Sequence, residues 1–484
     1  MIIRIAMPIQ IHVSFRHIVH VLLVILLFIA DVDVAAPRSI INTLTDFSGD
    51  LPFKLETGYV GVGDAEDLQL FYYFVESERS PENDPLLLWL TGGPCCSSVS
   101  ALLYEIGPLS FDYSNSNTDT APLILNPYSW TKVANIIFLD APAGTGFSYS
   151  ISSEGYPTTD TLFGAQVFEF IKKWLVSHPK FIINPLYIGG DSYSGKIVPI
   201  VVQQLSNGIE AGDQPPINLK GYILGNPVTD TRKEHYAFLE FAHRMGLLSD
   251  RIYKSAARNC KGEDTDDVDP NNVPCIEDLK VVNECIGDIF KNQILLPRHC
   301  QPPFGEQRIL QMENRQSSED NFVGFVPLPF KNLCQIEAGR WLTKNWGNKK
   351  EVKKSLKVRE ETKTTWTRCN RSIPYTFDVQ SSVVYHRNLT KKFLRALIYS
   401  GDHDMVVPYF STIEWIESLG LAIDYDWRPW FSDHHEVLGY TMKYTNKKYQ
   451  LTYATIKGGG HTAPQYYPEE CFRMFDRWLA HYPL

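Results

Sequence analysis

Continuous runs of apolar residues constrain the fold of this chain more than any other feature. Residues 86–90 (Leu-Leu-Leu-Trp-Leu) and 136–139 (Ile-Ile-Phe-Leu) contain no polar side chain, a pattern typical of strands buried on both faces. From Asp160 to Ser177 the apolar residues instead recur at helical spacing, and Asp160 is a suitable N-cap. Buried strands that alternate with helices predict an α/β fold, with a mostly parallel sheet and helices on both faces.

Four stretches of different composition organise the chain. We expect a signal peptide at residues 1–36, the first part of the core at 37–230, an inserted lid region at 231–372 and the second part of the core at 373–484. The lid region is polar and rich in cysteine, and its charge runs are typical of solvated loops and helix faces. After it, residues 393–399 resume the buried-strand pattern. A final helix starts at Pro468, and its expected inward face comprises Phe472, Phe475, Trp478 and Leu479.

The N-terminal segment has the pattern of a secretory signal. Arg4 and Arg16 precede an apolar run at residues 21–30, which is short for a bilayer span but suits a signal h-region. The small residues Ala35 and Ala36 predict cleavage nearby, and an uncleaved signal anchor is the alternative. After cleavage we expect a soluble protein of the secretory pathway with no membrane partner. The sequence leaves vacuole or extracellular space open as its destination.

Composition excludes several functional classes. The net charge of −9 argues against a nucleic-acid partner. None of the nine cysteines forms a Cys-x-x-Cys pair with matching histidines, so no metal site is indicated, and no cofactor either. In a secreted chain, nine cysteines predict disulfides with at least one free thiol. The sequons at Asn370 and Asn388 predict glycosylation.

The first feature that carries chemistry is a serine in a glycine-rich turn. Residues 186–188 are expected to form a strand, residues 189–195 (Gly-Gly-Asp-Ser-Tyr-Ser-Gly) a tight turn and residues 197–205 a helix. A serine on such a junction exposes its hydroxyl and leaves neighbouring backbone N–H groups free. Ser192 is therefore a candidate nucleophile, although many glycine-rich turns contain an inert serine.

A nucleophilic serine needs a base, and the base needs an acid that orients it. Residues 399–404 (Tyr-Ser-Gly-Asp-His-Asp) place two carboxylates after a core strand, and residues 457–461 (Lys-Gly-Gly-Gly-His) place His461 in a flexible loop. The order Ser, Asp, His is that of α/β-hydrolases. Asp402 and Asp404 compete for the acid role at this point.

Five motifs in order resemble the serine carboxypeptidase family. They are residues 90–98 (Leu-Thr-Gly-Gly-Pro-Cys-Cys-Ser-Ser), 140–149 (Asp-Ala-Pro-Ala-Gly-Thr-Gly-Phe-Ser-Tyr), 190–195, 401–404 and 460–464, and they span nearly the whole mature chain. The resemblance implies an α/β-hydrolase fold with an inserted, disulfide-stapled lid region. It implies Ser192, Asp404 and His461 as the catalytic triad, and the backbone N–H groups of Gly93 and Tyr193 as the oxyanion hole.

The same resemblance implies the pairing of the cysteines. The expected disulfides are Cys96–Cys369, Cys260–Cys275 and Cys300–Cys334. This pairing leaves Cys95, Cys285 and Cys471 as free thiols.

The substrate-binding positions depart from the peptidase pattern. Peptidases of the family carry Trp-Asn-Gly-Gly-Pro-Gly and Gly-Glu-Ser-Tyr-Ala-Gly, whereas this chain has Thr91, Asp191 and Ser194 in place of the Asn, Glu and Ala. In peptidases the Asn and Glu help to hold a peptide carboxylate, and Glu105 matches a third member of that network. The candidate substrate-binding residues are Thr91, Gly92, Asp191 and Glu105.

These departures resemble the plant serine carboxypeptidase-like acyltransferases, which use 1-O-β-glucose esters. The expected small-molecule partners are then a glucose ester that donates a phenolic acyl group and an alcohol or phenol that accepts it. A serine carboxypeptidase is the alternative. A catalytically impaired binding homologue is a third hypothesis, because Cys95 occupies a position where active family members have glycine. The sequence leaves oligomeric state, acyl group and acceptor open.

Overall fold

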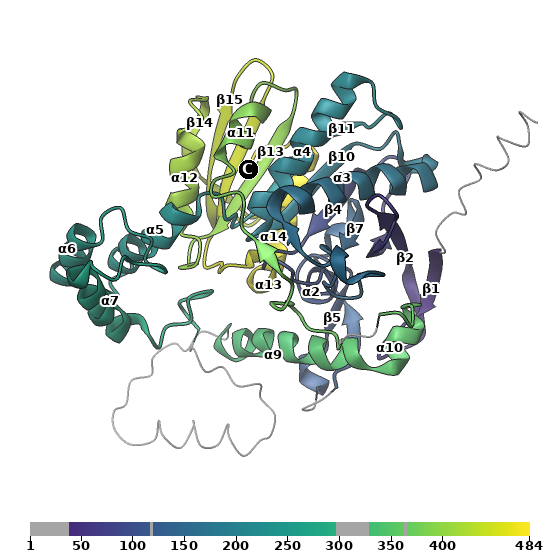
Figure 1. The fold of residues 1–484 in the computed structure, drawn as a ribbon, viewed down its shortest axis with the longest axis horizontal. Coiled ribbons are helices and arrows are strands. Elements are labelled where there is room, and N and C mark those ends of the chain that lie inside the picture. The colour runs from purple at the N-terminus through teal and green to yellow at the C-terminus, as the bar shows by residue number, and fades with distance from the viewer. Residues whose placement is uncertain (1–37, 117–119, 297–328, 363–364) are drawn as a thin grey trace, which may run out of the picture.

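A single large sheet organises the computed structural model, which describes residues 38–116, 120–296, 329–362 and 365–484 (Figure 1). The predicted signal peptide lies outside these residues. Among them, twelve strands form the sheet, in the order β1-β2-β3-β7-β4-β10-β11-β13-β16-β15-β14 with β8 paired to β3. The central strands run parallel and are β7 (Asn135–Leu139), β4 (Leu86–Leu90), β10 (Leu186–Asp191), β11 (Leu219–Gly225), β13 (Arg395–Gly401) and β16 (Gln450–Ile456).

Antiparallel strands extend the sheet at both sides. On one side lie β1 (Arg38–Thr43), β2 (Asp50–Val62), β3 (Leu68–Val75) and the short β8 (Tyr149–Ser150). On the other lie β15 (Val437–Thr445) and β14 (Ala422–Phe431). Two small sheets pair β5 (Leu109–Phe111) with β6 (Leu123–Leu125), and β9 (Thr158–Thr159) with β12 (Tyr375–Thr376).

The sheet divides the hydrophobic core into two layers, because successive side chains of a strand point to opposite faces. In β4, Leu87 and Trp89 join one layer, whereas Leu86, Leu88 and Leu90 join the other. The first layer packs against α2 (Val99–Tyr104), α9 (Pro329–Asn348), α10 (Lys350–Ser355), α13 (Ala463–Tyr466) and α14 (Pro468–Leu479). The second packs against α3 (Asp160–Ser177), α4 (Ser194–Ala211), α11 (Val383–Leu389) and α12 (Tyr409–Glu417). The predicted α/β architecture is confirmed.

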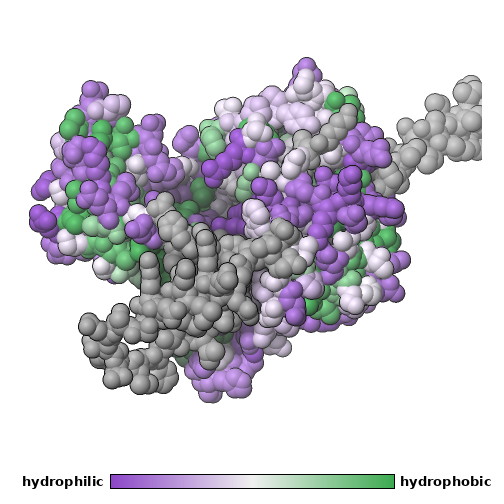
Figure 2. Space-filling model, turned by 90° about the horizontal axis from the view of Figure 1, so that it is seen from below, coloured by the Kyte–Doolittle hydropathy of each residue, from purple (hydrophilic) through white to green (hydrophobic). Residues whose placement is uncertain are grey.

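Part of the predicted lid region forms a lobe with its own small core. It consists of α5 (Thr231–Arg244), α6 (Asp250–Asn259) and α7 (Val273–Ile286), which pack around a third apolar cluster. The lobe lies at the left in Figures 1 and 2, and Figure 2 shows hydrophobic patches among its polar surface. Met405 and Phe410 from the main body belong to the same cluster, so the lobe is anchored next to the end of β13.

Local details differ from the expectations. Thr159, not Asp160, is the N-cap of α3: its hydroxyl accepts a hydrogen bond from the Leu162 N–H, and Asp160 is the first helical residue. The strand predicted from residue 393 begins at Arg395, because Phe393 is 76% exposed. The inward face of α14 comprises Cys471, Met474, Phe475 and Trp478, while Phe472 and Leu479 are only partly buried.

The structure contains the disulfides Cys96–Cys369 and Cys260–Cys275. The free cysteines among the described residues are Cys95, Cys285 and Cys471, as the resemblance implied. Cys300 of the third expected pair lies outside the described residues. Within the described ranges, no helix has the length and apolar character that a membrane crossing requires.

Candidate active site

Ser192 occupies the sharp turn between β10 and α4. Its φ of +54° lies in the left-handed region, which costs free energy for a residue with a side chain. The Ser192 N–H donates to the Gly225 carbonyl at 2.9 Å, and its own carbonyl accepts from the Val228 N–H at 2.9 Å and the Gly195 N–H at 3.0 Å. These bonds hold the strained turn in place at the carboxyl end of the central strands.

A continuous hydrogen-bond relay connects Ser192 to a buried acid. His461 Nε2 lies 2.7 Å from Ser192 Oγ, and His461 Nδ1 lies 2.7 Å from Asp404 Oδ2. The other Asp404 oxygen accepts from the Val406 N–H at 2.7 Å. Asp404 is fully buried, and its bond to Nδ1 orients the imidazole toward Ser192.

The competing carboxylate, Asp402, faces elsewhere. Its Oδ1 lies 2.6 Å from His403 Nδ1 and accepts from the Gly458 N–H at 2.7 Å. The structure therefore pairs Asp404, rather than Asp402, with His461. Asp402 instead braces the loop that leads to the histidine.

Asn226 is a site residue that sequence reasoning missed. It follows β11 directly, and its Nδ2 donates to Asp404 Oδ2 at 2.9 Å. Its Oδ1 accepts from the Gly401 N–H at 3.2 Å, which ties the acid-bearing loop to β11. A polar residue immediately after a buried strand was the available signal, because such positions lie at the edge where the other site residues gather.

The environment of His461 sets its proton affinity. Burial alone lowers the pKa of this imidazole, but the adjacent Asp404 carboxylate, aided by Asp191, outweighs burial and raises the pKa above its ordinary value. His461 is thus a stronger base than a free histidine, as proton transfer from a serine requires.

The loop after β4 passes directly beside the nucleophile. A Cβ built on Gly92 would lie 2.6 Å from the Cβ of Ser192 and 2.7 Å from the Tyr193 nitrogen, so only glycine fits there. Gly93, with a φ of +120°, follows it. Tyr193 immediately precedes α4, and the positive end of a helix dipole favours a developing anion. Both predicted oxyanion donors therefore belong to segments that flank Ser192.

A cavity of about 560 Å³ opens in front of Ser192. All four candidate substrate-binding residues line it: Thr91, Gly92, Glu105 and Asp191. The Thr91 hydroxyl donates to Ser98 Oγ at 3.3 Å, and Asp191 Oδ1 accepts from the Gly92 N–H at 3.3 Å. Arg340 and Arg368 line the same cavity.

The two acids in this cavity retain protons unusually well. Burial, reinforced by the charge of Asp191, raises the pKa of Glu105 well above its ordinary value. Burial also raises the pKa of Asp191. A protonated carboxyl group donates a hydrogen bond, so this corner offers both donors and acceptors to a polar ligand.

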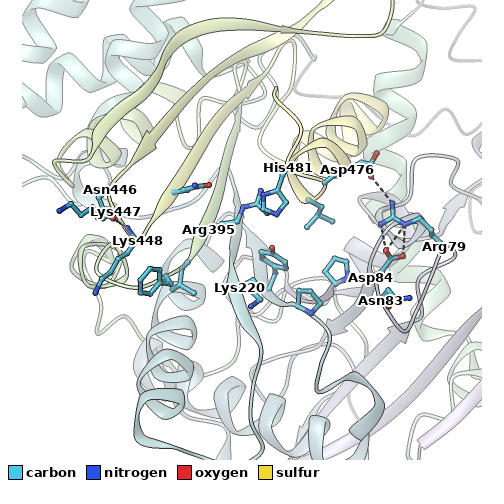
Figure 3. Close-up of a pocket in the computed structure, with 18 residues that line it drawn as sticks. Arg79, Asn83, Asp84, Lys220, Arg395, Asn446, Lys447, Lys448, Asp476 and His481 are labelled. Carbon is cyan, nitrogen blue, oxygen red and sulfur yellow. Dashed lines mark hydrogen bonds and ion pairs between the residues drawn. The ribbon is translucent and has the colours of Figure 1, made fainter.

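Another cavity, of about 650 Å³, lies at the amino ends of the central strands, opposite the ends that carry Ser192 and His461 (Figure 3). Its lining includes Pro85, Pro185, Lys220 and Arg395, which precede or begin central strands, whereas the residues of the relay follow strand ends. Figure 3 shows basic side chains around it, and none of the predicted site residues belongs to it.

Both sequon asparagines use their side chains within the fold. Asn370 lines the Ser192 cavity, its Nδ2 donates to the Gly144 carbonyl at 2.9 Å, and its Oδ1 accepts from the Ser372 hydroxyl at 2.6 Å. Asn388 Nδ2 donates to Gln203 Oε1 at 3.1 Å. Glycosylation of either residue stays a prediction. Across the described part of the chain, no cluster of three or more His, Cys, Asp or Glu residues is placed to hold a metal ion.

Cys95 combines a strained backbone with a place in the cavity wall. Its φ is +66°, its side chain is buried, and it lines the same cavity as Ser192. Burial raises the pKa of its thiol to about 12, although the Thr145 hydroxyl partly opposes the shift. Cys95 is therefore a neutral thiol, and glycine would adopt the same backbone without strain.

We expect Cys95→Gly to increase kcat several-fold, because relief of roughly 1–2 kcal/mol of left-handed strain lets the neighbouring Gly93 settle beside Ser192. Release of 4-nitrophenol from 4-nitrophenyl acetate measures kcat, and thermal unfolding measures stability. Cys285→Ser, which alters an exposed free thiol, is the matched control. An unchanged or lower kcat in Cys95→Gly would show that the thiol is neutral or useful.

Comparison with known proteins gives consistent matches. The family model described as serine carboxypeptidase matches residues 45–481. Serine carboxypeptidase-like 19 of Arabidopsis thaliana is 46% identical over 451 residues, which cover 92% of this chain and 95% of that protein. Serine carboxypeptidase-like 1 of the same plant is 44% identical over 452 residues, which cover 92% and 93%. The crystal structure of Kex1(delta)p, a prohormone-processing carboxypeptidase from Saccharomyces cerevisiae, matches the fold with a TM-score of 0.68 at 17% identity, over 91% of this chain and 94% of that one.

Proposed function

The chain belongs to the serine carboxypeptidase family and has an α/β-hydrolase fold, and from this premise we propose that it is an acyltransferase. Ser192 takes an acyl group, phenolic in our proposal, from a 1-O-β-glucose ester and passes it to an alcohol or a phenol. We place the enzyme in the secretory pathway, in the vacuole or outside the cell.

The observation that carries this proposal is the polar corner of the Ser192 cavity. A peptidase needs strong donors for a peptide carboxylate there, and Thr91 has no amide to offer. Its hydroxyl already donates to Ser98 Oγ. Asp191 is one methylene shorter than glutamate, and its carboxylate accepts from the Gly92 N–H. Both side chains thus already hydrogen-bond to protein groups at the cavity wall, which favours a neutral ligand such as a sugar over a peptide carboxylate.

The first half of the proposed reaction forms an acyl-serine. His461 Nε2 takes the proton of Ser192 Oγ while that oxygen bonds to the ester carbonyl carbon. The oxyanion that forms is stabilised by the N–H groups of Gly93 and Tyr193. The bond from the carbonyl carbon to the anomeric oxygen breaks, and His461 returns the proton to that oxygen, which releases glucose.

The second half repeats these steps with the acceptor. His461 takes the proton of the acceptor hydroxyl, whose oxygen attacks the acyl-serine carbonyl. The bond to Ser192 Oγ breaks, and the proton returns from His461 to that oxygen. A glucose ester is an activated acyl donor, so Ser192, His461 and the two N–H groups are sufficient for both halves of the proposed reaction.

A carboxypeptidase is the second candidate, and one observation favours it. Glu105, Asp191, Arg340 and Arg368 still line the cavity, and protonated acids beside guanidinium groups suit a terminal carboxylate. The third hypothesis, an impaired binding homologue, is motivated by Cys95. The intact hydrogen-bond chain from Asp404 through His461 to Ser192 argues instead for catalysis.

Separate assays with the two substrate classes distinguish these functions. Purified, glycosylated protein is incubated with 1-O-sinapoyl-β-glucose plus a panel of alcohols and phenols, and separately with N-blocked dipeptides. We expect a new ester and rapid glucose release only when an acceptor is present, and slow glucose release by hydrolysis when it is absent. Chromatography with mass detection follows each product, and Ser192→Ala is the blank. Efficient removal of C-terminal residues from the dipeptides, without transfer from a set of glucose esters, would establish the peptidase instead.

A further inference from the structure

A buried carboxylate beside the active site receives three hydrogen bonds from two separate segments. Asp160 is fully buried at the first residue of α3. Its Oδ1 accepts from the Tyr193 hydroxyl at 2.6 Å and the Tyr375 hydroxyl at 2.9 Å, and its Oδ2 accepts from the Val379 N–H at 2.9 Å. One side chain thus joins the residue after the nucleophile to the segment around β12.

The two phenols form an aromatic cluster with Phe377. The ring centroids of Tyr193 and Tyr375 are 6.1 Å apart, those of Tyr193 and Phe377 5.8 Å, and those of Tyr375 and Phe377 5.1 Å. Tyr375 and Phe377 line the cavity that contains Ser192. Phe377 is 55% exposed, so it presents an uncovered ring surface at the cavity wall.

We propose that Tyr375 and Phe377, backed by the ring of Tyr193, form an aromatic wall of the Ser192 cavity that selects acyl groups with a planar ring, and that Asp160 is the positioning residue that fixes this wall. This inference deepens the proposed acyl transfer and rests on the same acyl-serine site. A flat ring stacks on an aromatic face, whereas a puckered ring of equal size touches it at fewer atoms.

Rigidity of the wall follows from its anchors. Burial, together with the Asp160 carboxylate, raises the pKa of both the Tyr193 and the Tyr375 hydroxyl, so both are hydrogen-bond donors at neutral pH. Pairing of β12 with β9 fixes the backbone of Tyr375 next to Thr158. The ring of Phe377 packs against the two tyrosine rings, so its position depends on them.

The test uses two esters that differ only in the acyl ring, which is a planar phenyl in 4-nitrophenyl 3-phenylpropanoate and a puckered cyclohexyl in 4-nitrophenyl 3-cyclohexylpropanoate. Release of 4-nitrophenol reports acylation of Ser192 whichever nucleophile removes the acyl group. The result is therefore readable even if the protein fails to transfer from glucose esters. We expect kcat/KM to favour the phenyl ester by about 2- to 10-fold, the range of one aromatic stack.

The variants locate this preference. Phe377→Leu should bring the ratio of kcat/KM values close to one, mainly through KM of the phenyl ester. Asp160→Asn should reduce the ratio as well, and Tyr375→Phe, which keeps the ring but loses the bond to Asp160, covers the case in which Asp160→Asn does not fold. Phe393→Leu, an exposed phenylalanine at the opposite edge of the sheet, is the matched control and should keep the wild-type ratio.

Three outcomes would contradict the inference. A wild-type ratio near one, or an unchanged ratio in Phe377→Leu, would show that the wall does not select the acyl group. An unchanged ratio in both Asp160→Asn and Tyr375→Phe would remove Asp160 from the positioning role.

Discussion

Ser192→Ala should lower kcat/KM for any ester by about 10³- to 10⁶-fold and leave no acyl-enzyme in intact-protein mass spectra. Among the described residues, the hydroxyl of Ser192 is the nucleophile that His461 Nε2 contacts. Ser194→Ala is the matched control, since this buried serine lies two residues away and donates to the Leu90 carbonyl instead.

His461→Ala should cost about as much, and the double variant little more than either single variant, because nucleophile and base act as one unit. Rapid quenching with a 4-nitrophenyl ester measures the acyl-enzyme in each case. Multiplicative losses in the double variant, or a persistent acyl-enzyme in Ser192→Ala, would mean that another residue carries the acyl group.

Asp404→Asn should lower kcat by about 10⁴-fold, the loss typical when the acid of such a triad becomes an amide. The amide would turn a donor toward His461 and leave the buried imidazolium without a counter-ion. Asp402→Asn is the matched control: its carboxylate contacts His403 and Gly458, so the expected loss is well under 100-fold. If Asp402→Asn were the more severe variant, the acid would be misassigned.

The residual activity of Asp404→Asn should also change its pH dependence. His461 must be neutral to take the serine proton, and Asp404 raises the pKa of His461 above its ordinary value. Removal of that charge leaves burial and Arg340, which lower this pKa, opposed by Asp191 alone. The ascending limb of kcat/KM should therefore move to lower pH. A pH profile from 4 to 9 on a 4-nitrophenyl ester measures the limb. If the ascending limb stayed at the same pH in Asp404→Asn, the limb would not report the titration of His461.

The central strands were predictable because burial on both faces removes the need for polar residues. In β4 and β7 this produces unbroken apolar runs that stand out in the sequence. The edge strand β14 gave no such signal, since most of its residues are exposed and aromatic side chains alternate with charges. Its pairing with β15 depends on contacts between segments, which local sequence does not encode.

The three residues of the relay were predictable from the sequence, but the residues that hydrogen-bond to the relay and position its neighbours were not. Ser192 and His461 lie in glycine-rich turns that mark them, and Asp404 follows a buried strand. Asn226 also follows a buried strand, but an isolated polar residue beside an apolar segment, such as Asn226 or Asp160, is equally typical of a cap or a turn. Asp160 was predicted as a helix cap on local grounds, and its actual partners, Tyr193 and Tyr375, are 33 and 215 residues away.

The separation of Ser192 from His461 has a consequence for biosynthesis. The two residues are 269 positions apart, and ribosomes add about 5–20 residues per second, so the base emerges roughly 10–50 s after the nucleophile. Until then β16, which pairs with β13 and leads to His461, is absent from the sheet. In a nascent chain that has not reached residue 461, the hydroxyl of Ser192 therefore lacks the base that contacts it. The contacts of His461 with Asp404 and Ser192 can therefore form only after β16 has joined the sheet.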